Sequence, residues 1–70
     1  MEIHLPPQNI EAEQSVIGSM LMDKDAVIAV SGWLRAEHFY DERHGLIYEN
    51  ILELFSDGLP IDMVTLSDRL

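Results

Sequence analysis

The sequence predicts an all-α protein, a small orthogonal bundle of about four helices. Apolar residues recur at the three- and four-residue spacing of amphipathic helices, and no stretch alternates long enough to indicate a strand. Asn or Asp precedes these stretches and glycine follows two of them, as at helix starts and stops. Seventy residues without cysteine allow one small domain that no disulfide stabilises.

The first helix is predicted over residues 10–22. Pro6 and Pro7 hold φ at about −65° and keep a helix from starting before them, so residues 1–8 are expected to form an extended arm. Asn9 is the expected N-cap, because its side-chain oxygen can accept from the free N–H groups of the first turn. The helical domain is therefore expected over residues 9–70.

The second helix is predicted over residues 25–31 and is apolar nearly all round, which favours a central position. Its β-branched residues would also suit a short strand. Gly32 ends this segment. The connector that follows is rich in aromatic residues and is expected to pin the loop to the core through Trp33, Leu34, Phe39 and Tyr40.

The third helix is predicted over residues 41–56, with Gly58 just beyond it as the residue that ends the helix. Asp62 is the expected N-cap of a fourth helix. That helix has no stop signal before Leu70. The pattern therefore suggests a fragment whose last helix is truncated.

Three blocks of residues together resemble a known family. The first block is a Pro-Pro pair that leads into an Ile-Glu-Ala-Glu-Gln-Ser-Val-x-Gly run. The second combines aromatic residues with a histidine, and the third is a Gly-x-Pro-Ile-Asp element; all three blocks follow one another in the same order as in that family. In this sequence they are Pro6, Pro7 and Ile10–Gly18, then Phe39, Tyr40, His44, Ile47 and Tyr48, then Gly58, Pro60, Ile61, Asp62, Val64, Thr65 and Leu66. This set resembles the N-terminal domain of DnaB-type replicative DNA helicases.

The resemblance implies that residues 9–70 are part of the helical N-terminal head of a hexameric helicase. Its partners would be the other helicase subunits and primase, with a helicase loader acting on the same ring. The parent protein would bind and unwind duplex DNA with ATP and Mg in a separate ATPase domain, which is missing here. This chain by itself is expected to be non-catalytic.

Composition excludes several functions for the chain alone. Thirteen Asp and Glu against four Lys and Arg give a net charge of −9, so no basic stripe is available for the phosphates of nucleic acid. The sequence lacks the G-x-x-x-x-G-K-[ST] phosphate loop, which argues against ATP hydrolysis. No secretion signal is visible and uncharged runs are too short to span a membrane, so a cytoplasmic protein without membrane contact is expected.

Metal ligation and catalysis are not predicted. His38, Asp41 and His44 have a spacing that a metal could use on one continuous helix. The expected cap at Asp41 breaks that helix. We therefore predict no metal ligand, no cofactor-binding residue and no catalytic residue in this chain.

Two polar residues fall on faces that should be buried. At about 100° per residue, Glu13 lies near the middle of the apolar face of the first helix, and His44 lies near the centre of that of the third. Because a buried unpaired charge is costly, each side chain needs a partner. The simplest arrangement is that Glu13 and His44 pair with each other; a helix end or loop backbone is the alternative, and both residues are expected to be structural.

A few outward-facing residues are candidate partner contacts. Gly18 interrupts the first helix, at a cost of up to about 1 kcal/mol relative to alanine, which suggests close approach of another backbone. That backbone could belong to a later helix of the same domain, the preferred hypothesis, or to another subunit. The candidates are Ser15, Gly18 and Ser19 on the first helix and Leu46 on the charged side of the third.

Two other functions fit parts of the pattern. A free-standing helical adaptor or regulator of replication would have the same head without a motor. An acidic carrier protein has similar size, charge and helix content, but it needs an Asp-Ser-Leu attachment site for its prosthetic arm. Ser15 follows Gln14 and Ser67 precedes Asp68, so that site is missing.

Overall fold

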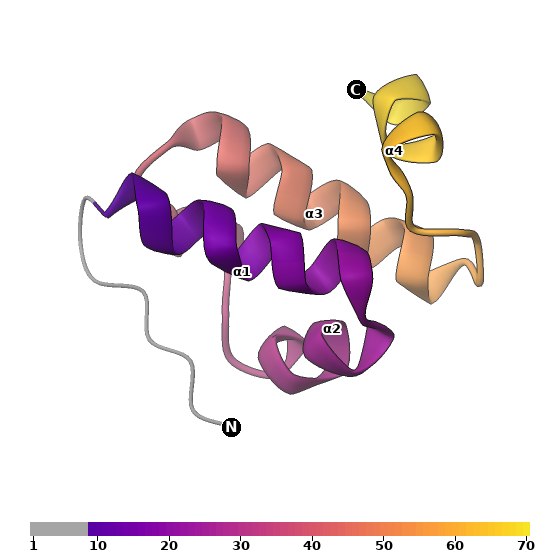
Figure 1. Cartoon of the computed structure of the whole chain (residues 1–70), viewed down its shortest axis with the longest axis horizontal. Coiled ribbons are helices and arrows are strands. Elements are labelled where there is room, and N and C mark those ends of the chain that lie inside the picture. Colours follow the sequence, from indigo (N-terminus) through magenta and orange to yellow (C-terminus); the bar gives the residue numbers. More distant parts are fainter. Residues whose placement is uncertain (1–8) are drawn as a thin grey trace.

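The computed structural model describes residues 9–70, and the expected arm over residues 1–8 lies outside the described residues. The described part is built from helices alone, which confirms the all-α prediction. They are α1 (Ile10–Met22), α2 (Lys24–Ser31), the short 3-10 helix η1 (Ala36–His38), α3 (Glu42–Ser56) and α4 (Met63–Arg69) (Figure 1). The sequence did not predict η1.

Helices α1 and α3 form the body of the molecule. They lie side by side and run in the same direction, so their N-terminal ends meet at one end of the bundle (Figure 1). Helix α2 turns back beneath the C-terminal half of α1, and α4 stands at the far end of α3. The N-terminal turns of α1 and α3 are thereby brought together.

Side-chain caps fix where each α-helix begins. Asn9 Oδ1 accepts from the N–H of Ala12 at 2.9 Å, and Asp62 Oδ1 accepts from the N–H of Thr65 at 2.8 Å. Both expected caps are therefore in place. The N–H groups of a first turn have no partner within the helix, and such a bond typically stabilises it by about 1 kcal/mol. Asp23 and Asp41 cap α2 and α3 in the same way.

Helix α3 ends in a Schellman motif at Gly58. The N–H of Leu59 donates to Leu54 O at 2.9 Å, and the N–H of Gly58 donates to Phe55 O at 3.2 Å. Gly58 has φ of 70°, a left-handed conformation that glycine adopts without strain. This turn reverses the chain and sets the start of α4.

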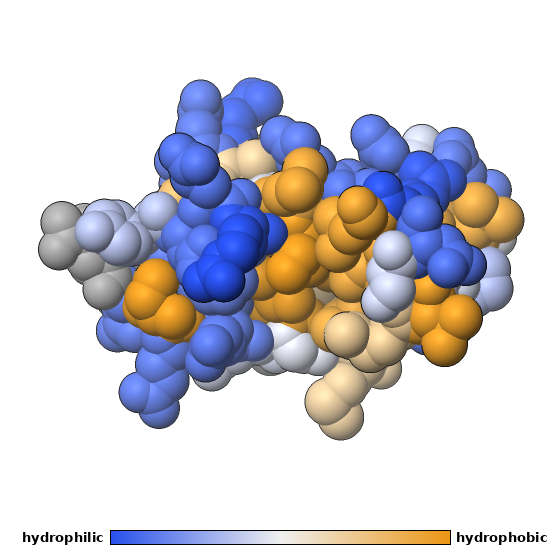
Figure 2. All heavy atoms as spheres, turned by 90° about the horizontal axis from the view of Figure 1, so that it is seen from above, coloured by the Kyte–Doolittle hydropathy of each residue, from blue (hydrophilic) through white to orange (hydrophobic). Residues whose placement is uncertain are grey.

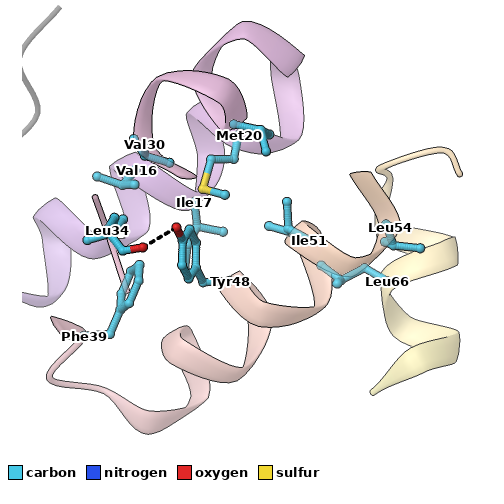
Figure 3. Packing of buried hydrophobic residues seen from close by; sticks show 11 residues of the cluster. Val16, Ile17, Met20, Val30, Leu34, Phe39, Tyr48, Ile51, Leu54 and Leu66 are labelled. Atoms are coloured by element: carbon cyan, nitrogen blue, oxygen red, sulfur yellow. Dashed lines mark hydrogen bonds between the residues drawn. The ribbon is translucent and has the colours of Figure 1, made fainter. Parts of the chain in front are cut away.

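The hydrophobic core lies between α1, α2 and α3 and extends to α4 (Figure 3). Tyr48 is almost fully buried and its hydroxyl donates to Leu34 O at 2.6 Å, so the large ring carries no unsatisfied polar atom. The fully buried side chains that surround it come from all three helices. The core consists of Val16, Ile17, Met20, Val27, Val30, Leu34, Phe39, Tyr48, Ile51, Leu54 and Leu66.

Two expectations about the middle of the chain are wrong. Helix α2 is not central, because it buries only Val27 and Val30 while Ile28 is 58% exposed. A helix that packs on one side only can carry an exposed apolar residue at modest cost. In the connector, Leu34 and Phe39 are buried as expected, but Trp33 and Tyr40 are 45% and 61% exposed.

Candidate functional site

Glu13 and His44 meet at the N-terminal end of the bundle, where α1 packs against the start of α3. Glu13 is only 1% exposed and the side chain of His44 is 12% exposed. Glu13 Oε1 lies 2.8 Å from His44 Nδ1. Because an ionised carboxylate can only accept, His44 Nδ1 carries the hydrogen in this pair. The structure thus brings together the two polar residues that the helical spacing placed on the buried faces.

The Glu13 carboxylate also binds backbone at the start of α3. Its Oε2 accepts from the N–H of Tyr40 at 2.7 Å, and its Oε1 accepts from the N–H of Asp41 at 3.3 Å. These two N–H groups immediately precede α3, where the helix dipole favours an anion. A side chain of α1 therefore accepts hydrogen bonds from the backbone at the N-terminal end of α3. We name this arrangement of Glu13, Tyr40, Asp41 and His44 the Glu13 node.

Electrostatics in the Glu13 node favour the ionised carboxylate. Burial alone would raise the pKa of Glu13, but the hydrogen bonds from His44, Tyr40 and Asp41 outweigh it and hold the pKa below the ordinary value. Next to the node, hydrogen bonds from Arg43 lower the pKa of the Asp41 carboxyl. Both acids are therefore charged near neutral pH, and each has its partners supplied by the fold.

Gly45 is a structural residue of this region that the sequence analysis missed. A Cβ built on Gly45 would lie 2.7 Å from the backbone oxygen of Ala36 in η1. Real Cβ atoms do not come this close to a carbonyl, so η1 can pack against α3 only because residue 45 lacks a side chain. The available signal was a glycine on the buried face of a helix, next to His44. Glycine within a helix costs about 1 kcal/mol relative to alanine, so its presence on that face indicates that packing requires a residue without a side chain.

The four candidate partner contacts lie on two separate surfaces. Ser15, Gly18 and Ser19 share the outer side of α1, and the Ser19 hydroxyl donates to Ser15 O at 3.0 Å. A Cβ built on Gly18 would have no neighbour within 4 Å among the described residues. The preferred hypothesis, that a later helix of the chain packs closely on Gly18, is therefore not met within residues 9–70. Leu46 is 53% exposed on α3.

Exposed apolar side chains on α4 and at Leu70, directly after it, form a further surface that the sequence pattern did not predict. Met63, Val64 and Leu70 are 63%, 74% and 57% exposed, whereas Leu66 is buried against the core. From the side of α3 and α4, hydrophobic residues gather over the middle and at the α4 end of the molecule (Figure 2). Such concentrations of apolar surface are typical of protein contact sites.

Arg69 links α4 to the end of α3. Its guanidinium donates to Glu53 at 2.9 Å and to Asp57 at 3.0 Å, both from the end of α3. These ion pairs are largely exposed and are individually weak. Together with buried Leu66 they hold the short helix against the core, while Met63 and Val64 remain exposed.

The described residues hold no group of three or more metal-ligating side chains. His38 Nδ1 accepts from the N–H of Arg35 at 3.0 Å, so one of the two histidines with metal-like spacing is engaged in the turn that forms η1. The other, His44, is engaged with Glu13. Among residues 9–70, no helix has the length and apolar character needed to cross a membrane.

Comparison with known protein families identifies the family of this chain. The model of the DnaB-like helicase N-terminal domain matches residues 5–70, nearly the whole chain. The chain is also similar to a solved structure described as the N-terminal domain of DnaB helicase from Mycobacterium tuberculosis, with a TM-score of 0.83 and 45% sequence identity. That similarity covers 91% of this chain and 46% of the solved one.

Curated relatives are much longer than this chain. The replicative DNA helicase DnaB of Leifsonia xyli is 45% identical over 65 residues, which are 93% of this chain and 14% of that protein. The replicative DNA helicase DnaC of Bacillus subtilis is 42% identical over 66 residues, which are 94% of this chain and 14% of that protein. The chain therefore spans about a seventh of the length of these two helicases.

Proposed function

The chain belongs to the family of DnaB-like helicase N-terminal domains, and from this premise we propose that it is the protein-interaction and ring-assembly part of a replicative DNA helicase. The observation that carries the proposal is the match of residues 5–70 to the family model, a range that includes all four α-helices. The chain contributes folded surface to this function, and no catalysis of its own is proposed.

In this proposal the parent protein is a cytoplasmic hexameric ring that unwinds duplex DNA at the replication fork. ATP and Mg act in its ATPase domain, outside these seventy residues. The N-terminal domains contact neighbouring subunits and primase, and a helicase loader acts on the ring. The names of the relatives, which are replicative DNA helicases, support this assignment.

The surface of the chain fits contacts with proteins better than contacts with DNA. Exposed apolar side chains on α4 and Leu46 on α3 offer area whose burial is favourable at about 25 cal/mol per Å². The chain carries −9 net charge, so DNA phosphates would be repelled. Ser15, Gly18, Ser19 and Leu46 remain the candidate residues for contacts with neighbouring subunits or primase.

We expect the isolated chain to bind single-stranded DNA more weakly than micromolar at physiological salt and to hydrolyse no ATP. Only four basic side chains are present, and two of them, Arg43 and Arg69, are in ion pairs with carboxylates of this chain. Fluorescence anisotropy with labelled DNA and a phosphate-release assay would measure both activities. The assay is done at about 150 mM salt, where the Debye length is about 8 Å. Saturable binding of DNA in the micromolar range under these conditions would contradict this prediction.

A chimeric helicase tests the assembly function. The matching 65 residues of the Leifsonia xyli helicase would be replaced by this chain. We expect the chimera to form rings, seen by analytical ultracentrifugation, and to unwind a forked duplex within about tenfold of the parent rate, a barrier difference of about 1.4 kcal/mol.

Two further chimeras separate folding from assembly. A Leu46→Glu chimera should fold with a stability change of at most about 0.5 kcal/mol, since surface substitutions rarely cost more, but should assemble less well if Leu46 contacts a neighbour. Glu11→Gln, on the exposed side of α1, is the matched control and should assemble normally. A chimera with the unsubstituted chain that folds but stays monomeric would contradict the assembly function.

A further inference from the structure

An open cleft of about 390 Å³ is lined by residues of α2, the connector and α3, and by none of the residues of the Glu13 node. The end of α2 and the connector form one wall, and α3 forms the other. Buried Leu34 and Tyr48 and half-buried Leu52 supply an apolar floor. Its volume falls within the range of about 300–1,000 Å³ that is typical of ligand sites. None of the functions assigned above uses this cleft.

Trp33 forms part of the rim and is held in a fixed orientation. Its indole Nε1–H donates to Ala29 O in the last turn of α2 at 3.1 Å, yet the side chain remains 45% exposed. An exposed indole face that is fixed in this way can stack on a cation. Tryptophan is enriched among the residues that dominate protein interfaces.

Charges around the cleft favour a cationic guest. Glu37 and Glu49 are exposed on its rim, and the described residues give neither of them an ion-pair partner. The last turn of α2 contains no basic residue, so the negative end of its dipole is not compensated there. Two carboxylates, a helix C-terminus and an aromatic face thus surround an apolar floor.

One cation, Arg35, also lines the cleft. It lies close enough to Tyr48 for its charge to oppose the rise in pKa that burial gives the Tyr48 hydroxyl. Arg35 would repel a cationic guest and attract an anionic one. Because Arg35 and the two glutamates have opposite effects on a charged guest, removing the charge of Arg35 tests whether the guest is a cation or an anion.

We propose that the cleft between α2, the connector and α3 binds an arginine side chain of a partner protein. The planar guanidinium would stack on the Trp33 indole and pair with Glu49, while its three methylene groups would lie on Leu52. Lysine is a poorer fit, because its compact and strongly hydrated ammonium does not stack. The proposal does not depend on the assembly function, since it rests on the cleft alone.

Titration with small probes tests this site on the full 70-residue chain. Trp33 is the only tryptophan, so its indole Nε1–H resonance and its fluorescence both report directly on the cleft. We expect Nα-acetyl-argininamide to shift the resonance saturably, with a dissociation constant on the order of millimolar. Nα-acetyl-citrullinamide, which has the same shape without the charge, should bind at least about fivefold more weakly at the same ionic strength.

Variants decide between a cationic and an anionic guest. Glu49→Gln should weaken argininamide binding about threefold, and Arg35→Gln should strengthen it by a similar factor. Glu11→Gln, on the exposed side of α1, is the control and should leave binding unchanged. Equal binding of the citrulline probe, no saturable shift with the arginine probe, or loss of binding in Arg35→Gln would each overturn the proposal.

Discussion

Replacing Glu13 by alanine is expected to lower the free energy of unfolding by about 3–5 kcal/mol, the usual cost of removing one partner from a buried charged network. Three donors lose their acceptor at once: the His44 ring and the N–H groups of Tyr40 and Asp41. A 70-residue domain has only about 3–5 kcal/mol to lose. The alanine variant should therefore be largely unfolded at 25 °C by circular dichroism.

Glu13→Gln gives a graded version of the same experiment. The amide keeps the size of the side chain and one acceptor oxygen, but its NH₂ group faces a donor and the charge is lost. We expect a loss of about 1–3 kcal/mol, measured by urea unfolding. Glu11→Gln, two residues away on the exposed side of α1, is the control and should change stability by at most about 0.5 kcal/mol. Equal effects of both substitutions would show that the Glu13 node adds nothing.

The Glu13 node also makes stability depend on acid. The pKa of Glu13 is lower in the folded chain than in the unfolded one, so its stabilisation is complete above the ordinary pKa of glutamate. It is then lost progressively as the pH falls through the folded-state value. Stability measured from pH 7 down to pH 3 should fall less steeply in Glu13→Gln than in the unsubstituted chain.

The sequence predicted the helices well because their signals are local. Asn9 and Asp62 each precede a stretch with helical apolar spacing, and Gly58 follows one. These residue types favour helix starts and ends through bonds to nearby backbone, so the helix ends could be predicted without knowing any long-range contact. The pairing of Glu13 with His44 was also within reach, because helical spacing alone puts both on buried faces. The backbone bonds to Tyr40 and Asp41 were not, since they depend on how α1 meets the end of the connector.

What the sequence did not predict depends on packing between elements. Helix α2 carries apolar residues on all sides, and nothing in its sequence tells which side remains exposed. The connector similarly gives no signal for η1 or for the cleft that Trp33 borders. Gly45 and Gly18 look alike in the sequence, as single glycines within helices, yet within residues 9–70 only Gly45 of the two is in close contact with another element.

This difference between the two glycines leads to opposite expected effects of the same substitution. In Gly18→Ala the new methyl group meets nothing within 4 Å among the described residues, so the higher helix propensity of alanine should raise the free energy of unfolding by up to about 1 kcal/mol. In Gly45→Ala the methyl group would lie 2.7 Å from Ala36 O. Relieving that clash must move η1, and we expect a net loss of about 1–3 kcal/mol.

Urea unfolding of the two variants measures both effects, and each variant is the other's control for helix propensity. Ala36 O also accepts from the N–H of Phe39 at 3.1 Å, so a shift of η1 in Gly45→Ala should appear at the Phe39 amide and at the neighbouring Tyr48 ring by NMR. The same signals should not move in Gly18→Ala. If Gly45→Ala were instead as stable as Gly18→Ala, η1 would have to shift at no cost. The close contact of η1 with α3 would then not be what requires glycine at position 45.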